Sequence, residues 1–222
     1  MVHTRKWWSK KLINVVTTGL VLFTAAGTLN WSMACVYYVI IIGYIVFNWH
    51  VLHPELHVER SMLKDGTIKW DMITAPFITI IGPLAMILTA GLDKRFDWSN
   101  VSIRIQIFGC LLLLIGASID TWAIKANKFY SKTVRIQYER NHVVIANGPY
   151  RFVRHPGYTG NILASIATPL ILGSLIALIP CALIVLGYVA RTILEDLTMQ
   201  RHFKGYYDYT KKVPYRLLPG IW

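Results

Sequence analysis

LINVVTTGLVLFTAAGTLNWSMACVYYVIIIGYIVFNW, residues 12–49, is a run of 38 residues without a charged side chain. A membrane-spanning helix needs about 20 mainly apolar residues to cross a hydrocarbon core of about 30 Å. At a rise of about 1.5 Å per residue, a single straight helix of this length would reach about 57 Å. The run is therefore predicted to form two membrane-spanning helices that turn at Gly27-Thr28-Leu29-Asn30.

Three further apolar stretches follow along the chain. Met72 to Leu92 predicts one span, and Ile105 to Ile124, interrupted only by Asp120, predicts another. Pro156 to Ala190 is uncharged and would be about 52 Å long if straight, so we predict a second hairpin with its turn at Gly173-Ser174. The expected fold is an all-α, polytopic transmembrane helical bundle of about six spans, although a kinked or re-entrant helix could replace either hairpin.

The composition is typical of a membrane protein. Hydrophobic residues make up 55% of the 222 residues and charged residues 15%, below the roughly 25% of soluble domains. This composition excludes a disordered or collagen-like chain, and the three cysteines, Cys35, Cys110 and Cys181, lie in apolar runs as packing residues rather than as a disulfide framework. Without an internal repeat, residues 1–222 are predicted to form one integral-membrane domain, with N-terminal helices in 1–126 and a functional core in 127–222.

The net charge of +12 is explained by membrane topology. With six spans, 20 of the 23 Lys and Arg residues fall on the side of both termini, and only Lys94, Arg95 and Arg104 fall on the other. Cytoplasmic loops carry such an excess of basic residues, so both termini and the loops around Lys64 and Arg140 are predicted to be cytoplasmic. Anionic membrane lipids are then the simplest partner, and no nucleic acid is needed to explain the charge.

The polar residues gather in two segments, 125–155 and 191–222, which this topology places on one face of the membrane. In the first, the alternation in 134–137 and 142–145 predicts short extended segments. A turn at 147–150 then leads to a basic and aromatic junction, with Pro156 in the first turn of a helix. Such a helix N-terminus suits an anionic or planar ligand; alternatively, Arg151, Arg154 and His155 reach lipid headgroups.

In the second segment, Arg191 and Glu195 are four residues apart and share a helix face. The alternative to a functional pair is a surface ion pair contributing about 0.3–0.5 kcal/mol. Asp196 is turned about 100° away and is predicted to cap the helix or contact water. The tyrosine- and lysine-rich tail, 206–216, is predicted to form an interfacial belt or lid.

Three histidines and one aspartate are the other polar residues in or next to the apolar runs that have candidate roles. His50, His53 and His57 could provide zinc ligands, but Pro54 interrupts their spacing, so we predict interfacial polarity and no metal site. Asp120 lies close to Lys125 in the sequence and is predicted to reach the membrane interface, with a buried role as the alternative.

Taken together, four motifs resemble the isoprenylcysteine carboxyl methyltransferase family of integral-membrane enzymes. The motifs are Gly148-Pro149-Tyr150, Arg154-His155-Pro156-Gly157-Tyr158-Thr159-Gly160, Arg191-x-x-x-Glu195 and Tyr206-Tyr207-x-Tyr209-x-Lys211-Lys212-Val213-Pro214-Tyr215-Arg216-x-Leu218-Pro219. The resemblance covers about the last 90 residues. Membrane phospholipid methyltransferases look similar around the same His-Pro and acidic positions.

The resemblance implies S-adenosyl-L-methionine as the cofactor. The cofactor-binding residues that it implies are Gln137, His142, Val143, Val144, Ile145, Tyr150, His155, Pro156, Tyr158 and Glu195. It implies Arg191 as the substrate-binding residue and Arg191 with Glu195 as catalytic residues. Such proteins often have two glutamates where this chain has Glu195-Asp196.

The residue types fit the implied chemistry. A sulfonium cation is stabilised by aromatic faces and a carboxylate, which Tyr150, Tyr158 and Glu195 can supply. A carboxylate acceptor is already ionised at neutral pH and needs no general base, so Arg191 can serve to position it. The expected activity is carboxyl O-methylation of a prenylated cysteine or a related lipid-like acid. The alternatives are N-methylation of a phospholipid headgroup and, as a different class, a transporter or membrane scaffold.

Overall fold

The computed structural model describes residues 2–52, 56 and 67–222, with side chains described from Trp7 onward. Its helices run in the order α1 (Val2–Ala26), α2 (Ser32–Val51), α4 (Asp71–Pro76), α5 (Gly82–Phe96), α6 (Ile103–Ala126), α7 (Pro156–Ile171), α8 (Leu178–His202) and α9 (Tyr206–Lys212). A π-helical turn, η1 (Phe77–Ile81), joins α4 to α5, and the 3-10 turns η2 (Tyr138–Arg140) and η3 (Gly148–Arg151) lie between α6 and α7. The described part of the chain is thus all-helical, as predicted.

Both predicted hairpins are present. The chain reverses between α1 and α2 at Gly27 and between α7 and α8 at Gly173, and both glycines have a φ of 68°, which favours glycine. Within the described residues, four helical segments are long and apolar enough to cross a membrane: Ser32–Val51, Asp71–Phe96, Ile103–Ala126 and Leu178–His202. Helix α1 begins with basic residues and α7 has 16 residues, so neither is among these four. An integral-membrane bundle is therefore established, while the total of six spans stays a prediction.

Glycines allow the closest helix contacts of the bundle. A Cβ added at Gly116 on α6 would lie 2.6 Å from the carbonyl oxygen of Gly160 on α7. Similarly, a Cβ at Gly187 on α8 would lie 2.6 Å from the Ile78 side chain in η1. Because no side chain separates the backbones at Gly116 and Gly160, the start of α7 is held against the end of α6.

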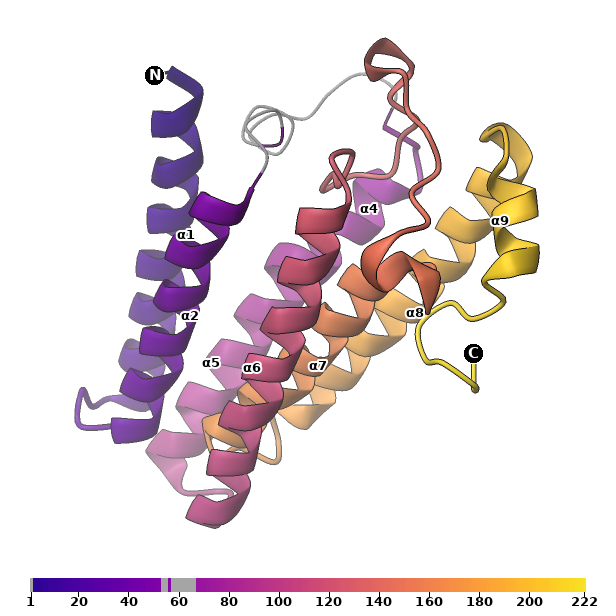
Figure 1. The fold of residues 1–222 in the computed structure, drawn as a ribbon. Helices are drawn as coiled ribbons and strands as arrows, with labels where there is room; N and C mark the ends of the chain where they lie inside the picture. Colours follow the sequence, from indigo (N-terminus) through magenta and orange to yellow (C-terminus); the bar gives the residue numbers. More distant parts are fainter. Residues whose placement is uncertain (1, 53–55, 57–66) are drawn as a thin grey trace.

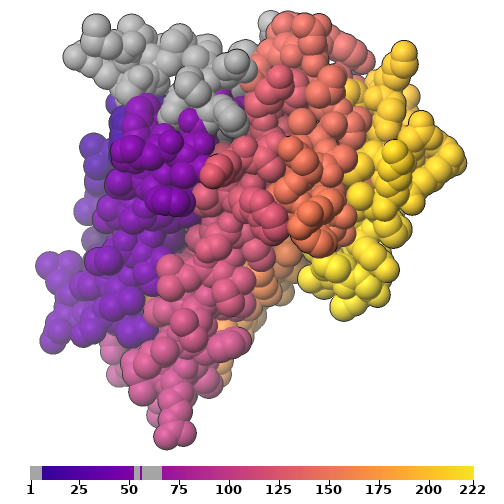
Figure 2. Space-filling view, in the orientation of Figure 1, coloured from indigo at the N-terminus to yellow at the C-terminus, as the bar shows by residue number. Residues whose placement is uncertain are grey.

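The two ends of the bundle differ in character (Figure 1). The turns after α1, α5 and α7 lie at one end, where Asp93 accepts hydrogen bonds from the backbone and hydroxyl of Ser99 and from the hydroxyl of Ser174. The N-terminus, segment 127–155 and α9 lie at the other end. Figure 2 shows the C-terminal residues packed beside segment 127–155 at that end. The polar segments are therefore brought together, as the sequence predicted.

Some local expectations need correction. Asp120 is buried, which agrees with the alternative prediction, and it accepts hydrogen bonds from the hydroxyls of Tyr44 and Tyr130 and from Asn161. The residues predicted to be extended, 134–137 and 142–145, have no regular secondary structure and form no strand. His53, His57 and Lys64, on which expectations also rested, lie outside the described residues.

Candidate active site

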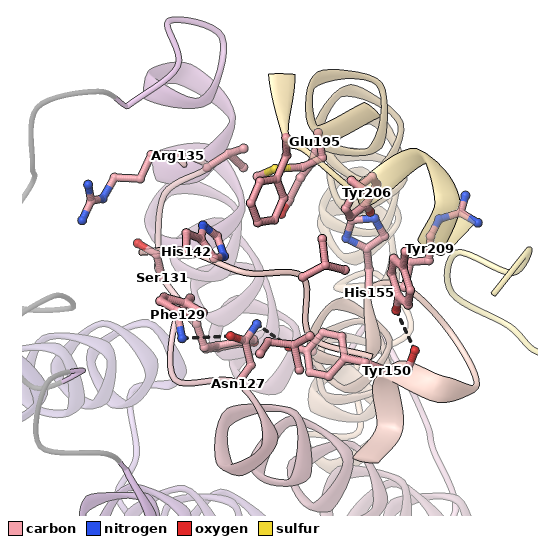
Figure 3. Close-up of a pocket in the computed structure, with 18 of the residues that line it drawn as sticks. Asn127, Phe129, Ser131, Arg135, His142, Tyr150, His155, Glu195, Tyr206 and Tyr209 are labelled. Atoms are coloured by element: carbon pink, nitrogen blue, oxygen red, sulfur yellow. Dashed lines mark hydrogen bonds between the residues drawn. The ribbon is translucent and has the colours of Figure 1, made fainter. Parts of the chain in front are cut away.

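A pocket opens at the end of the bundle that carries the polar segments (Figure 3). It has a volume of about 820 Å³, part of it open to solvent, and its walls come from segment 127–155, the start of α7, the end of α8, and α9.

Most of the predicted cofactor-binding residues line this pocket. They are His142, Val143, Val144, Ile145, Tyr150, His155, Tyr158 and Glu195. The lining does not include Gln137, Pro156 or Arg191. Pro156 is the first residue of α7, and Gln137 is fully buried behind the wall.

Gln137 stabilises the loop that forms one wall. Its side-chain amide donates a 2.8 Å hydrogen bond to the carbonyl of Phe129, and its side-chain oxygen accepts a 2.5 Å bond from Arg140. Its backbone N–H also points to Nδ1 of His142, at 3.3 Å. In this structure Gln137 therefore orients the pocket residues Phe129 and His142.

His142 is held between two aromatic rings. Its ring centroid lies 4.3 Å from that of Phe129 and 4.5 Å from that of Phe203. Burial, followed by the positive charges of Arg140 and Arg135, lowers the pKa of His142 to about 4. The imidazole is thus neutral near pH 7, and because Nδ1 accepts the N–H of Gln137, the tautomer carries its proton on Nε2.

The His-Pro motif places two rings and a carboxylate at the start of α7. The rings of His155 and Tyr158 stack at 5.5 Å with an interplanar angle of 7°. The Tyr158 hydroxyl donates a hydrogen bond to the carboxylate of Glu195 on α8. The first turn of α7 is thereby joined to α8 directly at the pocket, which combines an aromatic face with a negative charge.

Arg191 has a different partner from the expected one. Its Nε lies 3.0 Å from Oδ1 of Asp71, and its Nη2 donates to Oδ2 of Asp71 at 3.0 Å. Both side chains are buried, so the expected alternative of a surface pair with Glu195 is wrong. The guanidinium carbon also lies 5.3 Å from the ring centroid of Tyr158, so Arg191 adjoins the pocket lining without being part of it.

Asp196 has a structural role that the sequence did not predict. It is fully buried, so the expected capping or water contact is wrong. Arg154 donates to both of its carboxylate oxygens, at 2.8 and 2.7 Å. Tyr206 and Arg216 donate at 2.9 and 3.1 Å, which makes Asp196 the point where the α7 entry, α8 and the C-terminal tail meet.

The tail, which was predicted to form an interfacial belt or lid, forms part of the pocket wall. The backbone N–H groups of Arg154 and His155 donate to the carbonyls of Tyr215 and Arg216, at 3.0 and 2.9 Å. The Tyr209 hydroxyl donates to the carbonyl of Tyr150, at 2.6 Å. Burial raises the pKa of Tyr150, Tyr206 and Tyr209, so all three phenols are protonated near neutral pH.

The contacts with the tail also bear on the alternative prediction that Arg151, Arg154 and His155 reach lipid headgroups. Arg154 and His155 are buried, so they do not contact headgroups, whereas Arg151 is exposed. Several of the lining residues that sequence reasoning did not select are aromatic. They include Phe129, Tyr130, Phe203, Tyr206 and Tyr209. The sequence did contain a signal for Tyr206 and Tyr209, since both belong to the tail motif. Their contacts, with Asp196 and with the carbonyl of Tyr150 respectively, depend on the fold.

Comparison with known proteins agrees with the motifs. Residues 109–201 match the model of the isoprenylcysteine carboxyl methyltransferase (ICMT) family. Protein-S-isoprenylcysteine O-methyltransferase A of Arabidopsis thaliana is 28% identical over 131 residues, 58% of this chain and 63% of that protein. The B protein of the same plant is 28% identical over 170 residues, covering 74% of this chain and 83% of its own length. The Saccharomyces cerevisiae enzyme is 29% identical over 154 residues, 69% of this chain and 60% of its own.

The fold also has a solved counterpart. It is similar, with a TM-score of 0.50 and 15% identity, to the structure of a eukaryotic intramembrane Ras methyltransferase, isoprenylcysteine carboxyl methyltransferase. The match covers 96% of this chain and 94% of that one. By sequence, the chain spans 63% of the Arabidopsis A protein and 59% of a rice relative.

Proposed function

We propose that the chain is a member of the isoprenylcysteine carboxyl methyltransferase family that transfers a methyl group from S-adenosyl-L-methionine to the carboxylate of a prenylated cysteine or a related lipid-like acid. The observation that carries this proposal is the junction at the pocket, where Tyr158 contacts both Glu195 and Arg191. One aromatic ring thus links a carboxylate suited to a cationic donor with a guanidinium suited to an anionic acceptor.

The lining fits the proposed cofactor in its chemistry. When bound, S-adenosyl-L-methionine supplies a methyl group activated by a sulfonium charge. Glu195 and the face of Tyr158 would hold that cationic part, and the segment from His142 to Ile145, with Tyr150, would hold the remainder. The neutral His142 offers an Nε2–H donor without adding a second positive charge to the pocket.

The residues of the chain then act by binding, orienting and excluding water. An acceptor carboxylate is ionised near pH 7, so no side chain has to remove a proton from it. Arg191 would orient this carboxylate beside Tyr158, and the aromatic wall that includes Tyr206 and Tyr209 would limit access of water. Such positioning can supply most of the acceleration of an in-line transfer.

The alternative acceptor, a phospholipid amine, fits this arrangement less well. A protonated amine must lose its proton before it can attack, and the guanidinium of Arg191 would repel the protonated form. Glu195 could accept a proton, but its carboxylate already accepts the hydroxyl of Tyr158. The carboxylate acceptor is therefore favoured by the groups present.

The site is proposed to face the cytoplasm. The pocket lies at the end of the bundle that carries segment 127–155 and α9, where most of the basic residues in the described part of the chain are found. Basic residues concentrate in cytoplasmic loops of membrane proteins. Both termini and the pocket would then be cytoplasmic, and the lipid part of the acceptor would approach through the membrane.

Calorimetric titration of the purified protein with S-adenosyl-L-methionine tests the cofactor assignment. We expect Glu195→Gln and His155→Ala each to weaken binding by about tenfold or more, since each removes a group from the lining. Tyr207→Phe and Asp208→Asn, both on the exposed side of α9, serve as matched controls and should bind as the wild type does. Unchanged affinity in both pocket variants would contradict the assignment and leave the His-Pro segment as a structural anchor.

A further inference from the structure

Asp71, at the first position of α4, is a fully buried carboxylate that no step of the proposed reaction uses. Its Oδ1 accepts a 3.0 Å hydrogen bond from the hydroxyl of Thr74 and lies 3.0 Å from Nε of Arg191. Its Oδ2 accepts from Nη2 of Arg191 at 3.0 Å and from the backbone N–H of Val134 at 2.7 Å. One carboxylate therefore binds α4, α8 and segment 127–155 together.

These contacts connect the two halves of the proposed site. Val134 lines the cofactor pocket, whereas Asp71 and Arg191 lie just behind its lining. Arg191 reaches the lining on its other side through the ring of Tyr158. The position of the guanidinium relative to the pocket is thus fixed from two directions, by Tyr158 and, through Asp71, by Val134.

Asp71 also determines which edge of the guanidinium is available. It faces the edge formed by Nε and Nη2, and Nη2 donates in addition to the carbonyl of Lys132 at 2.7 Å. Among the described residues, none accepts a hydrogen bond from Nη1. An acceptor carboxylate would accordingly meet Nη1, and not the two parallel donors of a free guanidinium.

Building on the proposed function, we propose that Asp71 is a positioning residue that aims Nη1 of Arg191 at the acceptor carboxylate and sets its distance from the cofactor pocket. Methyl transfer requires donor and acceptor to be held at near-attack distance, and a misplacement of about 1 Å can cost about 100-fold in rate. A carboxylate that fixes both the arginine and the pocket wall is suited to this task. A purely structural ion pair would stabilise the bundle without a specific effect on the acceptor.

A double-mutant cycle separates these roles. It compares the wild type, Asp71→Asn, Arg191→Gln and the double variant, with an S-farnesylcysteine analogue in detergent as the acceptor. We expect Asp71→Asn to lower kcat/KM for the acceptor by about 10- to 100-fold while changing the affinity for S-adenosyl-L-methionine by less than about threefold. In the Arg191→Gln background, Asp71→Asn should cause less than about a twofold further loss, because its effect passes through Arg191.

Two further variants control for a loss of folding. Asp93→Asn removes another buried carboxylate from the same span, at the opposite end, and should leave kcat/KM of the folded protein unchanged. If Asp71→Asn does not fold, Asp71→Glu takes its place in the cycle. This variant keeps the charge but displaces the guanidinium. It should therefore also lower turnover of the acceptor in the protein that keeps Arg191, and not in the Arg191→Gln variant.

The outcomes distinguish this proposal from the proposed function. An equal loss from Asp71→Asn in both backgrounds, or an equal loss of cofactor affinity and acceptor turnover, would overturn the positioning role and leave the methyltransferase assignment intact. A wild-type protein that binds no S-adenosyl-L-methionine and methylates no farnesylcysteine analogue would overturn both. A loss confined to the Arg191 background, with cofactor binding retained, supports both.

Discussion

Glu195 and Asp196 are neighbours in the sequence, yet they lie in different surroundings, because each step along an α-helix turns a side chain by about 100°. Glu195 lines the pocket and accepts the hydroxyl of Tyr158. Asp196 is buried beside Arg154, Arg216 and Tyr206, behind the pocket lining and not part of it. The two acidic residues therefore have different roles. Glu195 is available to a ligand, and Asp196 stabilises the surroundings of the pocket.

Asp196→Asn tests the structural half of that division. The substitution leaves Arg154 buried without a charged partner, and breaking a buried ion pair in this way costs about 3–5 kcal/mol of unfolding free energy. Asp208→Asn is the control, because the Asp208 carboxylate is exposed and lies 3.8 Å from the exposed Lys211 amine. Asp208→Asn should lower the free energy of unfolding by less than about 1 kcal/mol. Denaturant unfolding in detergent measures both, and equal stabilities would contradict the central position given to Asp196.

His142 gives the protein a predictable pH dependence. Its pKa is about 4 in the folded protein against an ordinary value of 6.5. The imidazole is therefore neutral in both the folded and the unfolded protein above about pH 6.5. Between pH 6.5 and 4 the unfolded chain gains a proton that the folded protein does not, and stability falls as pH falls. The thermal midpoint of His142→Gln should therefore decline less over this window than that of the wild type or of His50→Gln, an exposed control. Parallel declines in all three proteins would refute a buried neutral imidazole.

At the scale of helices, the pocket depends on how closely α7 approaches α6. A Cβ at Gly160 would lie 2.5 Å from the carbonyl oxygen of Gly116, so Gly160→Ala must separate the two helices. We expect a loss of about 1–3 kcal/mol in stability and a weaker affinity for S-adenosyl-L-methionine, since His155 directly precedes α7 and Tyr158 lies in its first turn. At Gly43 an added Cβ meets nothing within 4 Å, and Gly43→Ala should keep both properties. Thermal unfolding and calorimetry test this, and a fully functional Gly160→Ala protein would contradict the packing argument.

The helices illustrate what the sequence could and could not predict. The length of an uncharged run fixes the number of membrane crossings that it can make, and glycine marks the turns, so both hairpins were foreseen. The eight predicted residues that line the pocket were foreseen because the resemblance to the family implied them. The pairing of Arg191 with Asp71 was not, because 120 residues separate them in the chain and only the packing of α4 on α8 joins them. The burial of the tail likewise depends on long-range contacts with Asp196.

For the whole molecule, the two chemically different ends predict a fixed orientation in the membrane. Tyr138 and Lys211 are exposed at the pocket end, and Lys94 is exposed at the end of the short turns. Single cysteines at these positions, in a chain whose Cys35, Cys110 and Cys181 are replaced by alanine, can be labelled with a membrane-impermeant reagent. Tyr138→Cys and Lys211→Cys should react from the cytoplasmic side and Lys94→Cys from the other. Labelling of Tyr138→Cys and Lys211→Cys from opposite sides would contradict the topology.

The identity of the methylated product tests the central claim most directly. Purified protein is incubated with methyl-labelled S-adenosyl-L-methionine and equal amounts of an S-farnesylcysteine analogue and phosphatidylethanolamine, over a range of pH. We expect a base-labile methyl ester on the farnesylcysteine analogue. Its rate of formation should not rise steeply where an amine deprotonates, provided that chemistry limits turnover. Stable methyl groups on phosphatidylethanolamine, formed faster as its amine deprotonates and without any ester, would contradict the central claim.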